Sequence, residues 1–391
     1  MSPALAWLIA SQIFLHASMA GMRLAAPLWA LREGCSQAWV GALLALFALT
    51  QVFLALPAGR YIDRHGLHRP LAWAAAAACA GATGAALDHS FAVLCAAALL
   101  TGGATGVASI ALQRFVGHAA HSSPTQLRQM FSWLAIGPAI SNFMGPFAAG
   151  VLIDGAGFRW AFFALALLPV LSWLCVSRVR EHHSAASVRP QMPAVGALGL
   201  LRQPSLRRLL LVNWLLASCW DVHTFLVPVL GHERGISASV IGSILGAFAI
   251  AAAAIRLAMP LVAARLSERS VVSVAMLMTA LLFALYPVLY SPWAMGACSV
   301  LLGLVLGSVQ PMIMSLLHQI TPAHSHGQAL GLRLMAINAS SVVMPLLFGS
   351  VGALAGVSLV FWATGLLVGA GARSAWLLGL QHKHNASEFK P

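Results

Sequence analysis

The chain has 391 residues, of which 60% are hydrophobic and only 8% are charged, and its mean hydropathy is +0.86. A soluble globular domain carries roughly 25% charged residues, so this composition excludes a soluble protein and indicates an integral membrane protein. The formal net charge of +13 would by its size fit a nucleic-acid-binding protein, but its distribution along the chain has a different explanation.

Twelve apolar runs follow one another along the chain, each about 20 residues or longer, which is the length that crosses a hydrocarbon core as a helix. They lie at residues 4–31, 37–59, 69–88, 91–118, 130–153, 158–177, 207–231, 237–263, 270–290, 293–318, 327–353 and 357–380. The runs are continuous rather than alternating, and backbone groups in lipid must be paired within their own segment, so we predict helices and not barrel strands. The predicted fold class is all-α integral membrane. The first run is too long for a signal-peptide core and lacks a basic leading segment, so we expect it to be retained.

The positive charges orient these spans. With the N-terminus in the cytoplasm, three of the 22 Lys and Arg residues lie outside, and three lie within spans. The outside residues are Arg32, Arg159 and Arg234, and those within spans are Arg23, Arg114 and Arg256. The remaining sixteen fall in inner loops, inner helix ends and the tail, which is the positive-inside pattern. We therefore predict a multi-pass protein of the bacterial cytoplasmic (inner) membrane with both termini in the cytoplasm.

The widest break between spans separates six spans from six, and an internal repeat supports this division. The stretches "EGCSQAWVGALLALFA" (33–48) and "RGISASVIGSILGAFA" (234–249) share six of sixteen residues at an offset of 201. The same offset pairs Pro27 with Pro228. We predict two related six-helix halves with a site between them. The N-terminal half, cytoplasmic linker, C-terminal half and cytoplasmic tail are predicted at 1–177, 178–206, 207–381 and 382–391.

The loop after the second span, "GRYIDRHGLHR" (59–69), resembles the loop signature of the major facilitator superfamily. The residues that carry this resemblance are Gly59, Asp63, Arg64, Gly66 and Arg69, whereas Leu67 and His68 stand where the family usually has basic residues. The resemblance implies a latch that joins the two halves on the cytoplasmic side when the cavity faces outward. Asp63 would dock on the N-terminus of the eleventh span, where unpaired N–H groups carry partial positive charge. Gly59 would allow close helix approach and Gly66 a sharp turn. The alternative is a solvated turn.

The fifth span contains "SNFMGPFAAG" (141–150), whose Gly145, Pro146 and Gly150 resemble the antiporter motif of the drug-proton exporters in this superfamily. Small residues let helices approach and proline bends a helix, which suits a gate hinge. The arginine that these exporters usually have on the fourth span is missing from "ALLTGGATG" (98–106).

Polar side chains mark one face of each of two spans. In the first span Gln12, His16 and Arg23 share a face by their spacing of four and seven residues. In the seventh, Asp221 shares a face with Ser218 and Thr224, and Trp214 lies two turns below it, whereas His223 is turned away by about 200°. Lipid does not tolerate such faces, so we expect them to point into the protein. Asn338 on the eleventh span would bind a ligand or bond across helices.

The repeat suggests a partner for Asp221. At the offset of 201 it corresponds to Ala20, one turn from Arg23 on the same face. In the resembled fold the first and seventh spans are symmetry mates that line the central cavity, so Asp221 and Arg23 would face each other from opposite walls. Our hypothesis is that this pair senses a proton or a substrate. The alternatives are a permanent buried ion pair, or an aspartate bonded to Ser218 and Thr224.

These patterns predict a secondary active transporter that moves a small amphiphilic organic compound by alternating access. The gradient of protons is the expected energy source, with efflux by antiport as the first choice and proton-coupled uptake of an organic anion as the alternative. A remote alternative is a membrane-embedded enzyme that uses His16 or His223 with Asp221, but no nucleophile with a histidine at helical spacing appears in a span. We expect a monomer in the lipid bilayer, with no cofactor, metal site, catalytic residue or nucleic-acid partner.

Overall fold

The computed structural model describes residues 3–119, 124–179, 201–262, 267–321 and 326–377. Within these residues all regular structure is helical, which confirms the predicted all-α class. The elements are α1 (Pro3–Arg32), α2 (Gln37–His65), α3 (His68–Leu87), α4 (Phe91–Ala119), α5 (Pro124–Ala156), α6 (Phe158–Ser177), α8 (Pro204–Glu233), α9 (Ala238–Val262), α10 (Glu268–Leu285), the short 3-10 helix η2 (Tyr286–Val288), α11 (Pro292–Ile320), α12 (His326–Ala355) and α13 (Val357–Trp376). Eleven of these helices, all but α5, are long and apolar enough to cross a membrane over their described residues. The α5 helix packs between α1 and α9.

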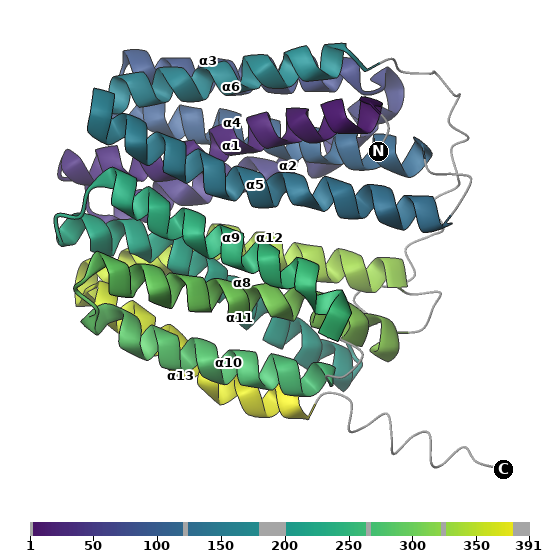
Figure 1. Cartoon of the computed structure of the whole chain (residues 1–391), viewed down its shortest axis with the longest axis vertical. Helices are drawn as coiled ribbons and strands as arrows, with labels where there is room; N and C mark the ends of the chain where they lie inside the picture. The colour runs from purple at the N-terminus through teal and green to yellow at the C-terminus, as the bar shows by residue number, and fades with distance from the viewer. Residues whose placement is uncertain (1–2, 120–123, 180–200, 263–266, 322–325, 378–391) are drawn as a thin grey trace.

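The helices form two groups, α1 to α6 and α8 to α13, drawn above and below each other in Figure 1. We call these groups the N-terminal and C-terminal halves. We call the end where α1 and α8 begin the inner end, following the orientation predicted from the charge pattern, and the opposite end the outer end. The α8 helix begins at Pro204, three residues before the predicted span, because proline is well suited to the first helical position.

The two halves repeat the same helix lengths. Adding 201 to the bounds of α1 gives those of α8, and the same offset converts α4 into α11. The turns after α1 and α8 contain Gly34 and Gly235, whose φ angles of 82° and 65° lie in the left-handed region that favours glycine. Within each half the repeated glycines Gly102 and Gly303 let helices touch, because a Cβ at either would overlap a backbone oxygen of the neighbouring helix. The repeat thus reproduces both the turns and the close contacts.

Close helix crossings join the halves at the outer end. The α5 helix crosses α9 where Gly242 lies against the backbone oxygen of Pro146, and α2 crosses α12 where Gly41 lies against that of Pro345. A Cβ at any of these glycines would overlap the opposing backbone, so no larger residue fits without separating the helices. One turn from Pro345, Gly349 lies in the same way against the backbone oxygen of Gln37.

The described residues show no such crossing at the inner ends of the same helices. No described atom lies within 4 Å of the position that a Cβ would take at Gly59, near the inner end of α2. Phe53, Leu257 and Met335, on the inner parts of α2, α9 and α12, are 72%, 68% and 69% exposed. Among the described residues, the close contacts between the halves therefore lie at the outer end, which is the arrangement of an inward-facing state.

Candidate functional site

Asp221 lies buried in the middle of α8, where this helix packs on α12. Its carboxylate accepts hydrogen bonds from the hydroxyls of Ser340, at 3.0 Å, and Ser341, at 3.4 Å. Among the interactions described, neither Ser218 nor Thr224 bonds this carboxylate directly. Ser218 donates to the backbone oxygen of Trp214 and pairs with the hydroxyl of Ser340 at 3.2 Å, and Thr224 donates to the backbone oxygens of Trp220 and Asp221. The predicted bonding of Asp221 to these two residues is therefore indirect through Ser340 for Ser218 and limited to the backbone for Thr224.

Arg23 approaches Asp221 from the other half. The guanidinium is half-buried on α1, and it lies within electrostatic range of the Asp221 carboxylate. The bonds described for Asp221 come from Ser340 and Ser341 and not from Arg23, so the two charges interact without direct contact. The structure therefore brings together the pair that the repeat suggested, across the boundary between the halves.

The remaining polar residues of α1 face α5. His16 is half-buried, bonds to Asn142 of α5 and lies within electrostatic range of Arg23. Gln12 is buried against Gly137, and its Oε1 has no hydrogen-bond partner among the described residues. Sequence reasoning missed Asn142, although it lies within the antiporter-like stretch 141–150 and matches Ser341 in the other half at an offset of 199.

His223 does not belong to this central group. Its ring is fully buried within the C-terminal half, where it stacks on Phe248 at a centroid distance of 4.1 Å. Its Nε2 pairs with the hydroxyl of Ser299 at 2.9 Å, and Tyr286 bonds the same hydroxyl. The placement of His223 among the cavity residues is thus corrected, because the 200° turn from Asp221 directs it into the helix packing.

The other predicted cavity residues are spread over α8 and α12. Trp214 and Thr224 are half-buried on α8, and Asn338 on α12 is exposed. Arg256 of α9 packs over the ring of Trp220, with its guanidinium 5.4 Å from the ring centroid. The described contacts of Arg256 are thus with an aromatic ring rather than with the central charges.

The inner loop motif is only partly described. Gly66 ends α2 with φ 71°, and its N–H donates to the oxygen of Ile62, as a sharp turn requires. Arg64 and Arg69 are exposed. The expected close approach at Gly59 is not made by any atom of the described residues. The side chain of Asp63 lies outside the described residues, so its docking on α12 stays a prediction.

The antiporter-like motif of α5 serves both halves. Gly145 packs against α1 of its own half, where a Cβ would meet Ala17 and Ala20, whereas Pro146 and Gly150 pack against α9 of the other half. The α12 helix carries the same Pro-x-x-x-Gly pattern at Pro345 and Gly349. Sequence reasoning noted only the α5 copy, because the α12 copy lacks the preceding glycine.

Asp154, one turn beyond this motif, ties α5 to the start of α9. Its carboxylate accepts hydrogen bonds from the backbone N–H groups of Ala238, at 3.1 Å, and Ser239, at 2.7 Å. Burial raises the pKa of Asp154, but the hydrogen bonds from Ser239 and Ala238 together outweigh it and hold the pKa below its usual value. An acid of the N-terminal half thus caps a helix of the C-terminal half.

Arg333 of α12 is a charge whose burial sequence reasoning missed. It lies at the inner end of its candidate span, as the charge pattern predicts, but its side chain is only 6% exposed. Its Nε donates to Oδ1 of Asn213 on α8 at 3.1 Å, and its Nη2 donates to Oε1 of Gln310 on α11. A signal was available, because Asn213 matches Gln12 at the offset of 201.

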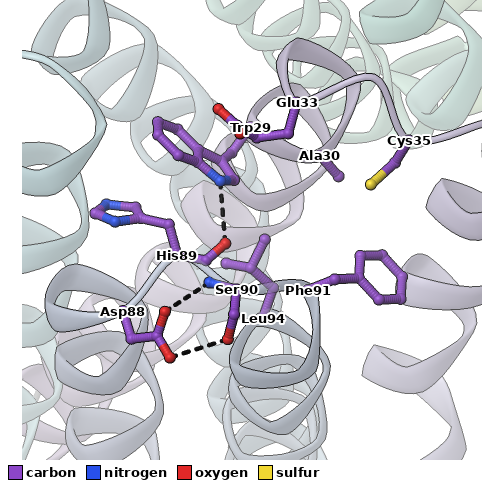
Figure 2. A pocket seen from close by; sticks show the side chains of 9 residues that line it. All are labelled: Trp29, Ala30, Glu33, Cys35, Asp88, His89, Ser90, Phe91 and Leu94. Atoms are coloured by element: carbon purple, nitrogen blue, oxygen red, sulfur yellow. Dashed lines mark hydrogen bonds between the residues drawn. The ribbon is translucent and has the colours of Figure 1, made fainter.

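A separate pocket of about 370 Å³ lies at the outer end of the N-terminal half (Figure 2). The indole of Trp29 donates to the backbone oxygen of His89 at 3.0 Å, and Asp88 accepts from the backbone and hydroxyl of Ser90. The Asp88 carboxylate is thereby used within its own turn. Among the described residues no group of three or more His, Cys, Asp or Glu could hold a metal ion.

Two repeated six-helix halves, joined at one end and contributing charges to a shared centre, define a membrane transporter rather than an enzyme. The chain belongs to the Major Facilitator Superfamily, whose family model matches residues 8–229 and again 209–391.

Two similar proteins are both multidrug resistance proteins MdtG. The protein of Enterobacter lignolyticus is 25% identical over 60% of this chain and 58% of its own length. That of Citrobacter koseri is 24% identical over 62% of this chain and 61% of its own length. The chain thus aligns with less than two thirds of each relative.

Solved structures share the fold at low identity. A nucleoside transporter NupG variant matches with a TM-score of 0.77 and 15% identity, over 95% of this chain and all of the other. A bacterial homologue of the human lysosomal transporter Spinster, in an inward-facing and occupied conformation, matches with a TM-score of 0.80 and 13% identity, over 97% of both chains.

Proposed function

We propose that this transporter exports a small amphiphilic organic compound from the bacterial cytoplasm in exchange for protons. The observation that carries the proposal is the buried Asp221 at the boundary of the halves, bonded by α12 and within electrostatic range of Arg23. Ionisable residues inside a membrane are costly and are mostly functional. The similarity to multidrug resistance proteins supports export. We propose a monomer in the inner membrane with both termini in the cytoplasm.

The coupling step follows from the charges. Ionised Asp221 attracts Arg23 across the boundary, and this attraction favours the arrangement in which α1 and α8 are close. A proton on Asp221 removes the negative charge and therefore the attraction, so protonation and the separation of the halves are linked free energies. A bound substrate charge acts on the same pair by competing for one partner.

Alternating access then requires the outer end to open and the inner end to close. In the described state the crossings of α5 with α9 and of α2 with α12 close the outer end. For the cavity to face outward these crossings must separate while the inner ends meet, where the loop motif at 59–69 would latch them. The family resemblance of that motif supports this second state.

A second candidate is proton-coupled uptake of an organic anion. The observation that favours it is the balance of charge inside the described residues, because Arg23 and Arg333 are positive and Asp221 is the only acid among the buried side chains. A net positive cavity attracts anions in either direction of transport. The sign of proton movement in inverted vesicles distinguishes the two, since antiport and symport move protons in opposite directions relative to the substrate.

The test is transport by the purified chain in proteoliposomes under an imposed pH gradient, screened with organic anions, cations and neutral amphiphiles. Asp221→Asn keeps the size of the side chain but removes its titratable proton, so we expect gradient-driven transport to be lost. Asp88→Asn is the matched control, because Asp88 is an exposed acid bonded within its own turn. Undiminished coupling to the pH gradient in Asp221→Asn would overturn the proposal.

A further inference from the structure

Arg333 forms a polar cluster with two amide side chains inside the C-terminal half. Its guanidinium is held by Oδ1 of Asn213 and Oε1 of Gln310, so three helices, α8, α11 and α12, meet at this side chain. Arg333 and Asn213 are only 6% and 4% exposed. Both oxygens that accept from Arg333 belong to neutral amides, so the cluster keeps a full positive charge in a buried place.

Such a charge is costly unless something compensates it. Removing a cation from water is unfavourable, and amide dipoles replace only part of the lost hydration. Because a guanidinium only donates, the Asn213 amide must direct its oxygen toward Arg333. The Nδ2 of Asn213 is then buried without a hydrogen-bond partner among the described residues. The cluster therefore offers a cation and a free amide donor, which together suit a ligand that only accepts.

The cluster lies on the inner side of Asp221, along the same helix interface. Arg333 precedes Ser340 by seven residues on α12, so the two share a helix face about 10 Å apart. On α8, Asn213 lies eight residues, or about 12 Å, before Asp221. The half-buried Trp214 stands beside Asn213, on the face of Asp221. A cation and an aromatic ring thus lie at similar depth on the inner side of the acid.

We propose that Arg333, supported by Asn213 and Gln310, binds the carboxylate of the transported compound. The inference rests on the proposed transport function and names its substrate class: an amphiphile with one carboxylate, whose apolar body extends along Trp214 toward Asp221. A second anionic group about 1 nm from the first is disfavoured, because it would meet the Asp221 charge. The guanidinium fork matches the two oxygens of a carboxylate.

The experiment uses the full chain in nanodiscs and three ligands of one shape: 3-phenylpropanoate, 3-phenylpropanol and 3-phenylpropylamine. Calorimetry at constant ionic strength is expected to show the acid binding at least about tenfold more tightly than the alcohol or the amine. In Arg333→Gln this preference for the acid is lost, whereas affinity for the alcohol stays within about twofold. Arg256→Gln is the matched control and keeps the preference, since Arg256 packs on Trp220.

A purely structural role for Arg333 gives a different result. Arg333→Gln would then lower the melting temperature of the ligand-free protein and leave the ratio of acid to alcohol affinity unchanged, which overturns the proposal. If that variant does not fold, Asn213→Asp tests the same point, because it places a carboxylate against Arg333. We expect this variant to fold and to lose the preference for the acid, and a retained preference overturns the proposal. The proposal is also overturned if the unaltered chain binds the acid and the alcohol equally, or binds neither detectably.

The binding measurements need no proton gradient, so they test the carboxylate site independently of the proposed proton-coupled transport. Loss of acid binding in Arg333→Gln together with intact proton coupling in Asp221→Asn would leave the binding site standing and remove the proton-coupled mechanism. Intact acid binding in Arg333→Gln together with lost coupling in Asp221→Asn would do the reverse.

Discussion

The bond between Asp154 and the start of α9 predicts how firmly the outer end is closed. Replacing Asp154 with Ala removes both hydrogen bonds to the backbone N–H groups of Ala238 and Ser239. A capping side chain contributes about 1 kcal/mol, and a negative charge at a helix N-terminus adds about 0.3–1 kcal/mol. In the proposed outward-facing state the two halves separate here and this bond is broken. We therefore expect the variant to shift the ratio of outward-facing to inward-facing molecules by about tenfold, which corresponds to about 1.4 kcal/mol.

The assay is a distance distribution between spin labels on the outer turns of the two halves. Ser90 and Ser291 suit it, because both are exposed and they occupy equivalent positions at the offset of 201. The labels are attached to cysteines at these positions in a chain whose six native cysteines have been replaced. We expect the longer distance, from the outward-facing state, to gain population in Asp154→Ala.

Asp154→Asn is the graded control, since it keeps an acceptor oxygen but loses the charge, and its effect should lie between those of the native residue and alanine. An unchanged distance distribution in Asp154→Ala would refute the reasoning, because the bond would then not contribute to closing the outer end.

Further predictions concern the same seam and the interior of the C-terminal half. Gly41→Leu introduces a side chain that overlaps the backbone oxygen of Pro345, so the distance between labels at Ser90 and Ser291 should lengthen. Gly155→Leu is the control and should leave this distance unchanged, because no described atom lies within 4 Å of a Cβ there. Equal effects of the two variants would contradict the role of the crossing. While the outer end is closed, the pKa of Asp154 lies below its ordinary value of 3.8. The stabilisation of the closed outer end by the Asp154 carboxylate is therefore fully present above pH 3.8, and it is lost as the pH falls through this lower pKa. The difference between Asp154→Ala and the native chain should therefore be constant from pH 5 to about pH 8, and a difference that disappears within this range would count against the assignment. His223→Ala removes a buried ring and its hydrogen bond to Ser299, so it should lower the free energy of unfolding by roughly 2–4 kcal/mol. Proton coupling should persist in this variant. Loss of coupling in a folded variant would show that His223 takes part in coupling.

The sequence was sufficient for the helices and their repetition. Apolar runs of membrane length predict spans directly, since the backbone N–H and C=O groups of a segment in lipid must form hydrogen bonds within that segment. The start of α2 at Gln37 and the start of α9 at Ala238 agree with the offset of 201. The face of Arg23 and the face of Asp221 could likewise be derived from helical periodicity and the repeat.

The contacts of Asp221 and Arg333 could not be derived in this way. Ser340 lies 119 residues from Asp221, and Gln310 lies 23 residues from Arg333, so only the packing of α8, α11 and α12 brings them together. An arginine near the inner end of a span also has a common alternative, which is to extend toward the lipid headgroups. Only the amide oxygens on neighbouring helices distinguish the buried position from that alternative.

The Asp154 contact could not be predicted from the sequence for a different reason. It joins the two halves, and under the proposed alternating access it is present only while the outer end is closed. A periodicity argument concerns one helix at a time and carries no information about which state is populated.

The repeated Pro-x-x-x-Gly pattern of α5 and α12 has a consequence for the order of opening. Duplication of one half supplies two equivalent crossings, and equivalent crossings would separate together. Asp154 breaks this equivalence, because a carboxylate on two backbone N–H groups holds α9, whereas the start of α2 is joined through the side chains of Gln37 and Glu233. We therefore expect the crossing of α2 with α12 to separate before the crossing of α5 with α9.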